Sequence, residues 1–164
     1  MPSRESRSNP CRDKDNPKTI RYMKTINERQ DELIEEFSFL DDWMDRYALI
    51  IEMGNELEPL PENDKVPNHT IEGCQSRVWI TGDAHPDGTL WLKADSDAVI
   101  VKGIIAMLLR VLSGQKPEDI VSADLYFIDR LGLKEHLSPT RSNGLLAMVR
   151  HIKILAQAMI TVRK

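Results

Sequence analysis

One cysteine in a polar, glycine-containing stretch is the feature of this sequence that most directly suggests chemistry. Cys74 follows Gly73 and precedes Gln75 and Ser76, and an apolar run begins at Val78. Because glycine adopts backbone angles that other residues resist, Gly73 favours a tight loop between two extended segments, with Cys74 at its tip. A thiol in such a loop can react with another molecule. Free cysteine is also among the most buried residue types, so the local pattern leaves a packing role open.

The remaining nucleophiles and ligands form no recognisable cluster in the sequence. Cys11 and Cys74 are the two cysteines of the chain, too few for a disulfide framework or a cysteine-based metal site. A cysteine-nucleophile hydrolase would need a histidine beside Cys74. His69 is five residues away and His136 is remote in sequence, so a hydrolase stays an alternative. A non-catalytic interaction module, in which Cys74 only packs, is another.

Composition and charge narrow the class of protein. The 164 residues are 41% hydrophobic and 29% charged, which is typical of one globular domain. No run of eighteen apolar residues occurs, so we expect no membrane span. Residues 1–24 hold seven Lys/Arg and three Asp/Glu, and the net charge is −4, so residues 25–164 carry −8. This acidity argues against nucleic-acid binding and favours a partner with a basic face.

The first 24 residues differ from the rest. They are polar, contain Pro2, Pro10 and Pro17, and show no apolar periodicity. We therefore expect a disordered basic N-terminal extension over residues 1–24 and one domain over residues 25–164. Without an apolar signal peptide, the cytoplasm is the expected compartment.

The domain is predicted to begin with two helices. Thr25 and Glu28 have the spacing of a capping box, and Asp41 or Asp42 can cap a second helix that ends at Gly54 or Asn55. Three short strands are expected next, at about residues 70–72, 78–81 and 89–93, with a turn at residues 85–88.

The second half of the domain is predicted to be helical. Residues 95–97 offer an N-cap for an apolar helix over residues 98–112. Short helices are expected at Pro117 and at residues 125–131, with His136 in the loop that follows. Ser138-Pro139 should begin a long last helix, which places Arg141 in its first turn, where the helix dipole disfavours a cation. From position alone, Arg141 is a solvated surface residue.

Motifs spread along the chain resemble the SufE family of sulfur-acceptor proteins. In order, they are Gly73-Cys74-Gln75-Ser76 with Val78-Trp79, Asp95-Ser96-Asp97 with Ile100-Val101-Lys102-Gly103, Glu118-Asp119-Ile120-Val121, and Leu137-Ser138-Pro139-Thr140-Arg141-Ser142-Asn143-Gly144-Leu145. They span nearly all of residues 25–164, and the first 24 residues fall outside the resemblance.

The resemblance implies an α+β fold, with a three-stranded antiparallel sheet flanked by helices, of the kind shared with IscU-like cluster scaffolds. It implies that Cys74 carries sulfur as a persulfide, supported by Arg141 and Gly73, for iron–sulfur cluster assembly. The scaffolds hold iron with three cysteines, whereas this domain has one, so we expect no cluster, metal or cofactor of its own.

The implied partners are a SufS-like or CsdA-like cysteine desulfurase, which would carry PLP, and a downstream cluster scaffold. The protein would then be a sulfurtransferase-like activator of the desulfurase. Nucleic acid and membrane are not expected partners, and a homodimer stays open. The chemistry is consistent, since a single thiolate is sufficient to take the outer sulfur from a persulfide.

Overall fold

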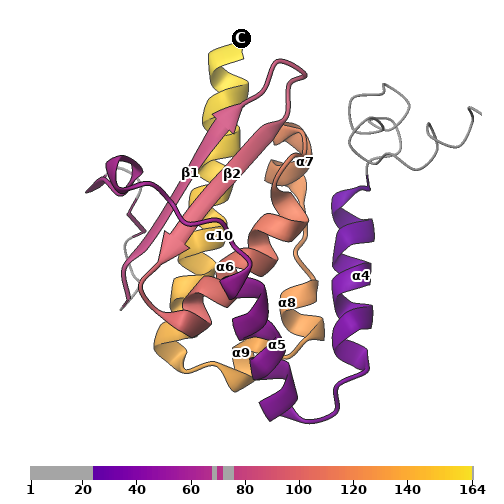
Figure 1. Cartoon of the computed structure of the whole chain (residues 1–164). Helices are drawn as coiled ribbons and strands as arrows, with labels where there is room; N and C mark the ends of the chain where they lie inside the picture. Colours follow the sequence, from indigo (N-terminus) through magenta and orange to yellow (C-terminus); the bar gives the residue numbers. More distant parts are fainter. Residues whose placement is uncertain (1–23, 68–69, 72–75, 164) are drawn as a thin grey trace, which may run out of the picture.

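An antiparallel hairpin with helices packed on one side forms the framework of this protein (Figure 1). It is seen in a computed structural model that describes residues 24–67, 70–71 and 76–163. The elements are α4 (Ile26–Ser38), α5 (Trp43–Asn55), the 3-10 turn η1 (Glu62–Asp64), β1 (Val78–Ala84), β2 (Leu90–Ser96), α6 (Val99–Leu112), α7 (Pro117–Ser122), α8 (Phe127–Arg130), α9 (Leu133–His136) and α10 (Pro139–Arg163). The α+β class is therefore as predicted.

Among the described residues the sheet has two strands, and the predicted third strand is not confirmed. β1 and β2 pair from Val78↔Ser96 to Ala84↔Leu90. The expected first strand is reduced to a bridge between Thr70 and Trp79 and a hydrogen bond from Ile71 N–H to the Val78 carbonyl, 2.9 Å long. The N–H of Thr70 donates to the carbonyl of Pro67 and not to β1. Glu72, the last residue of the predicted strand, lies outside the described residues.

The core is organised around α6, which is apolar on nearly every side. Ile104, Ile105, Met107, Leu108 and Leu112 are almost completely buried. This helix contacts β2 on one side and α5, α4 and α10 on others. Its burial explains why its sequence reads as one continuous apolar run.

The predicted N-cap at residues 95–97 was wrong. Helix α6 begins at Val99 after Ala98, and no side chain caps it. Asp95 and Ser96 instead continue β2, where the ladder with β1 holds them. The Ser96 hydroxyl donates to the carbonyl of Arg77 and accepts from the N–H of Ala98, so it joins the hairpin base to the helix start.

Helices α5 and α6 cross at two glycines. A Cβ on Gly103 would lie 2.1 Å from the carbonyl oxygen of Ile50, and a Cβ on Gly54 would lie 2.6 Å from the nitrogen of Gly103. Both contacts are with backbone atoms, which cannot turn aside as a side chain can. Any larger residue at this crossing would push the two helices apart.

Helices α4 and α5 begin where the sequence predicted. The Thr25 hydroxyl accepts from the N–H of Glu28, and the Glu28 carboxylate accepts from the N–H of Thr25, which completes the capping box. Asp42 caps α5 by accepting from the N–H of Met44. Both caps involve residues that are close in sequence, which is why the spacing of these residues was sufficient to predict where the two helices begin.

Helix α10 runs the length of the domain beside the hairpin (Figure 1). Ser138 caps it through a bond from the N–H of Arg141 to the serine hydroxyl. By length and composition alone Pro139–Val162 could cross a membrane. One face of this helix is buried in the core, as in the core helices of globular domains. The buried residues are Leu145, Met148, Ile152 and Ala156. Length and apolar composition therefore do not by themselves indicate that α10 spans a membrane.

Candidate functional site

Cys74 and Gly73 lie outside the described residues, as do Cys11 and His69. The described ends of the cysteine loop are Ile71 and Ser76. Ile71 is buried and bonded to β1 through its N–H. Just after Ser76, the N–H of Arg77 donates to the Asp97 carboxylate, and the Arg77 carbonyl accepts from Ser96. Both described ends of the loop are therefore fixed to the hairpin.

The structure brings Arg141 to the C-terminal end of this loop. A hollow of about 90 Å³ is lined on one side by Ser76 and on the other by the first turns of α10, including Arg141 and Gly144. Val101, Ile104 and Met148 supply its apolar wall. Arg141 is exposed, so its guanidinium stays hydrated while lying beside the site. Arg141 is thus a surface residue, as its sequence position indicated, and it also borders the hollow next to Ser76.

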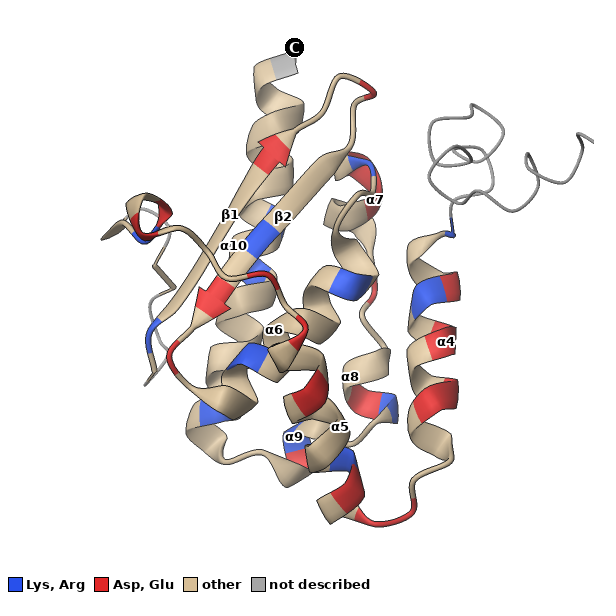
Figure 2. Cartoon of the chain, viewed as in Figure 1, with Lys and Arg blue, Asp and Glu red and all other residues tan. Residues whose placement is uncertain are grey.

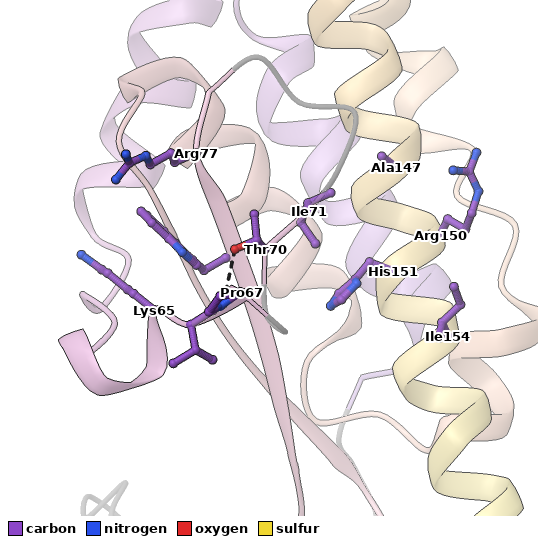
Figure 3. Close-up of a pocket in the computed structure, with 11 residues that line it drawn as sticks. Lys65, Pro67, Thr70, Ile71, Arg77, Ala147, Arg150, His151 and Ile154 are labelled. Carbon is purple, nitrogen blue, oxygen red and sulfur yellow. Dashed lines mark hydrogen bonds between the residues drawn. The ribbon is translucent and has the colours of Figure 1, made fainter.

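A larger pocket opens at the other end of the loop. It measures about 720 Å³ and lies between the segment before the loop, β1 and α10 (Figure 3). Its lining residues are Lys65, Val66, Pro67, Thr70, Ile71, Arg77, Trp79, Ala147, Arg150, His151 and Ile154. We call it the flanking pocket.

A buried carboxylate supports the wall of the flanking pocket. Asp95 accepts hydrogen bonds from the N–H groups of Leu60 and Ser96, at 3.1 and 2.8 Å. The ammonium groups of Lys65 and Lys102 lie 3.6 and 3.5 Å from its oxygens. Burial raises the pKa of Asp95, but these hydrogen bonds and the two lysines together outweigh it, so its pKa lies below the ordinary value.

Lys65 is held over an aromatic ring. Its ammonium lies 5.1 Å from the centroid of the Trp79 ring and 3.0 Å from the Glu62 carboxylate. The hydrogen bond with Glu62 raises the pKa of Lys65 more than burial lowers it. Lys65 therefore stays protonated at neutral pH, with part of its charge balanced by Glu62 and Asp95.

The sequence reasoning missed the four basic residues that line the pocket, namely Lys65, Arg77, Arg150 and His151. Arg150 and His151 interrupt the apolar pattern of α10, and that interruption was the available signal. His151 Nε2 lies 3.2 Å from the carbonyl oxygen of Ile80, which can only accept, so this nitrogen carries a proton.

The other described histidines lie elsewhere. His136, expected in a loop, ends α9 and stacks on Trp43 with ring centroids 3.8 Å apart. His85 is in the hairpin turn and stacks on Trp91. Within the described ranges, no group of three or more His, Cys, Asp or Glu side chains is placed to hold a metal ion.

The fold defines a class of protein: a small α+β domain in which an antiparallel hairpin and a long helix pack around an apolar helix. The family model described as the Fe-S metabolism associated domain, SufE, matches residues 31–156. An uncharacterized SufE-like protein of Rhizobium meliloti (strain 1021) is 41% identical in an alignment of 135 positions that covers 79% of this chain and 96% of the relative. The chain belongs to the SufE family.

A solved structure shares the fold. The solution structure of a hypothetical protein from Thermus thermophilus superimposes with a TM-score of 0.68 at 23% identity. The match covers 81% of this chain and 96% of the other. At this level of identity the likeness concerns the fold alone.

Proposed function

We propose that this protein accepts sulfur from a cysteine desulfurase onto Cys74, stimulates that enzyme, and delivers the sulfur for iron–sulfur cluster assembly in the cytoplasm. The observation that carries the proposal is membership of a family associated with Fe–S metabolism, in a chain whose domain has one cysteine. That cysteine occurs in a short segment whose two described ends, Ile71 and Ser76, each border a hollow of the surface.

The transfer is a thiolate exchange. The Cys74 thiolate attacks the outer sulfur of the persulfide on the desulfurase, and a new sulfur–sulfur bond forms at Cys74. The bond between the outer sulfur and the desulfurase cysteine breaks, and that cysteine leaves as a thiolate. One persulfide is consumed and one is formed, so no external oxidant or reductant is needed. In this scheme PLP belongs to the desulfurase, and the acceptor needs no cofactor.

Arg141 supports this chemistry electrostatically. A guanidinium near a thiol favours the thiolate, which is the reactive form. Arg141 lines the same hollow as Ser76, two residues after Cys74 in sequence. We infer that Arg141 raises the thiolate population of Cys74 or completes the surface on which the desulfurase docks.

The deciding experiment incubates the protein with a cysteine desulfurase and free cysteine and measures its intact mass. We expect wild type to gain one sulfur atom and Cys74→Ser to gain none, because a serine hydroxyl stays protonated and does not displace sulfur. The serine variant should still bind the desulfurase without speeding its turnover. Cys11→Ser is the matched control and should behave as wild type.

Two results would contradict the proposal. One is an unmodified wild-type protein, which is the outcome for a hydrolase or an inert interaction module. The other is loss of sulfur acceptance in Cys11→Ser with acceptance retained in Cys74→Ser, which would move the carrier role to the other cysteine.

A further inference from the structure

The flanking pocket has the layout of a protein-binding surface. Its floor is apolar and contains Ile71, Ala147 and the ring of Trp79. Ile154 borders it and leaves 59% of its surface exposed. In Figure 3, Arg77 and Lys65 extend on the β1 side and Arg150 on the α10 side. An apolar centre with charged groups at the rim is the usual anatomy of a protein interface.

A small anion fits the flanking pocket less well than a protein segment does. A site for a small ligand needs a few polar groups that converge on one point. Here the cationic groups stand on opposite rims, and Lys65 is already engaged by Glu62 and Asp95. A longer segment can reach both rims at once, which a single phosphate or carboxylate cannot.

The charge of the pocket is opposite to that of the domain. Residues 25–164 carry −8, and Asp and Glu recur along α4 and α5 (Figure 2). None of the described residues that line the flanking pocket is acidic. In the described part of the chain, the guanidinium groups of Arg77 and Arg150 have no carboxylate within 4 Å. Both groups are exposed and remain available for an acidic partner.

We propose that the flanking pocket docks an acidic segment of the cysteine desulfurase. Carboxylates of that segment pair with Arg77 and Arg150, and an apolar side chain between them packs on Trp79 and Ile154. This inference rests on the proposed function, because it names where the sulfur donor is held. Such a contact beside the cysteine loop adds a local electrostatic attraction between the two proteins.

The test is a double charge reversal, Arg77→Glu with Arg150→Glu. Binding is measured against the PLP-containing cysteine desulfurase of the same organism, at low and at high ionic strength. We expect the affinity at low ionic strength to fall by about tenfold or more, mainly through a slower association rate. The loss should shrink at high ionic strength, where exposed charges are screened.

The matched control reverses two exposed cations on the α7 and α8 side, Lys116→Glu with Arg130→Glu. It changes the net charge by the same amount and should have a much smaller effect. A third variant, Ile154→Asp, should also weaken binding because it removes the apolar anchor. Its negative charge should further repel the acidic segment.

Sulfur loading from inorganic polysulfide separates docking from chemistry. This donor needs no docking surface, so the double reversal should load as wild type does. If wild type binds no desulfurase, the proposed function fails and the inference fails with it. If wild type binds and the double reversal binds equally well, or if the control pair weakens binding as much, only the inference is wrong. Self-association of wild type that the reversal abolishes, with desulfurase affinity unchanged, would assign the pocket to a second copy and overturn the proposal.

Discussion

At the scale of single residues, Arg141 lies at a position of its helix that is unfavourable for a cation, and its role in sulfur acceptance can be tested by substitution. A cation in the first turn of a helix opposes the helix dipole. The backbone of Arg141 is satisfied by Ser138, while its side chain borders the hollow that Ser76 closes on the other side.

Arg141→Ala should therefore leave a folded protein that accepts sulfur more slowly. We expect a loss of about tenfold, the order of one charge-assisted contact to a thiolate. The rate of loading by the desulfurase and the pH titration of the Cys74 thiol are the measurements. Arg130→Ala, which removes an exposed cation from α8, is the control. Wild-type loading together with an unchanged thiol titration would return Arg141 to the role of a surface charge.

Asp95 is the residue on which the supporting network depends. It joins the segment before η1 to the end of β2, and its two lysines are Lys65, directly after η1, and Lys102 in α6. Because its side chain is 7% exposed, these contacts are largely shielded from solvent. Asp95 was predicted as a helix cap, and its actual role arises from chain segments that are far apart in sequence.

Asp95→Asn should destabilise the fold by about 1–3 kcal/mol at neutral pH, because one backbone N–H loses its acceptor and two lysines lose their counter-ion. The pKa of Asp95 is lowered in the folded state, so its stabilising effect is complete above about pH 4 and is lost as the pH falls through the folded value. The difference in unfolding free energy between wild type and variant should therefore narrow below about pH 4. Denaturant unfolding at several pH values measures it, and a difference independent of pH would contradict the assignment.

At the scale of the elements, what the sequence could predict was local. The capping box at Thr25 and the cap at Asp42 involve neighbours within three residues, and both were found. The third strand depended on backbone pairing with β1, and in the described residues that pairing is seen only at Thr70 and Ile71. The flanking pocket could not be predicted, because Lys65, Arg77 and Arg150 come from separate elements that only the tertiary fold brings together.

The crossing of α5 and α6 allows two opposing effects of a glycine-to-alanine substitution to be compared, the loss of close helix packing and the gain in helix propensity. Alanine is favoured over glycine by about 1 kcal/mol inside a helix. Gly103→Ala should nevertheless destabilise by about 1–3 kcal/mol or more, because the added Cβ meets the backbone of Ile50. Ala48→Gly on the exposed side of α5 is the control and should lose about 1 kcal/mol through propensity alone. Thermal unfolding of both variants measures this, and a stabilised Gly103→Ala would show that the helices can separate at no cost.

At the scale of the whole molecule, the charge of the chain is divided between its two parts. The first 24 residues are basic and the remainder acidic, so the net charge of −4 conceals a larger asymmetry. The first described residue already contributes to the domain. The carbonyl of Lys24 accepts from the buried Gln115 amide at 2.9 Å, and its ammonium pairs with Glu32. Among the described residues, Lys24 thus makes contacts with the domain although it precedes Thr25, the first residue of the predicted domain.

Truncation can locate this boundary. A chain that begins at Lys24 should unfold at the wild-type temperature and accept sulfur normally, because residues 1–23 lack the apolar side chains needed to form a core. A chain that begins at Thr25 should lose about 1–3 kcal/mol, since the buried amide of Gln115 is left without the Lys24 carbonyl. For a domain of this size, that loss lowers the melting temperature by about 2–4 °C per kcal/mol. Calorimetry of the two truncated chains beside wild type measures the difference. Equal melting temperatures for the two truncated chains would show that the Gln115 contact is dispensable. A melting temperature of the chain beginning at Lys24 below that of wild type would show that residues 1–23 contribute to the stability of the fold.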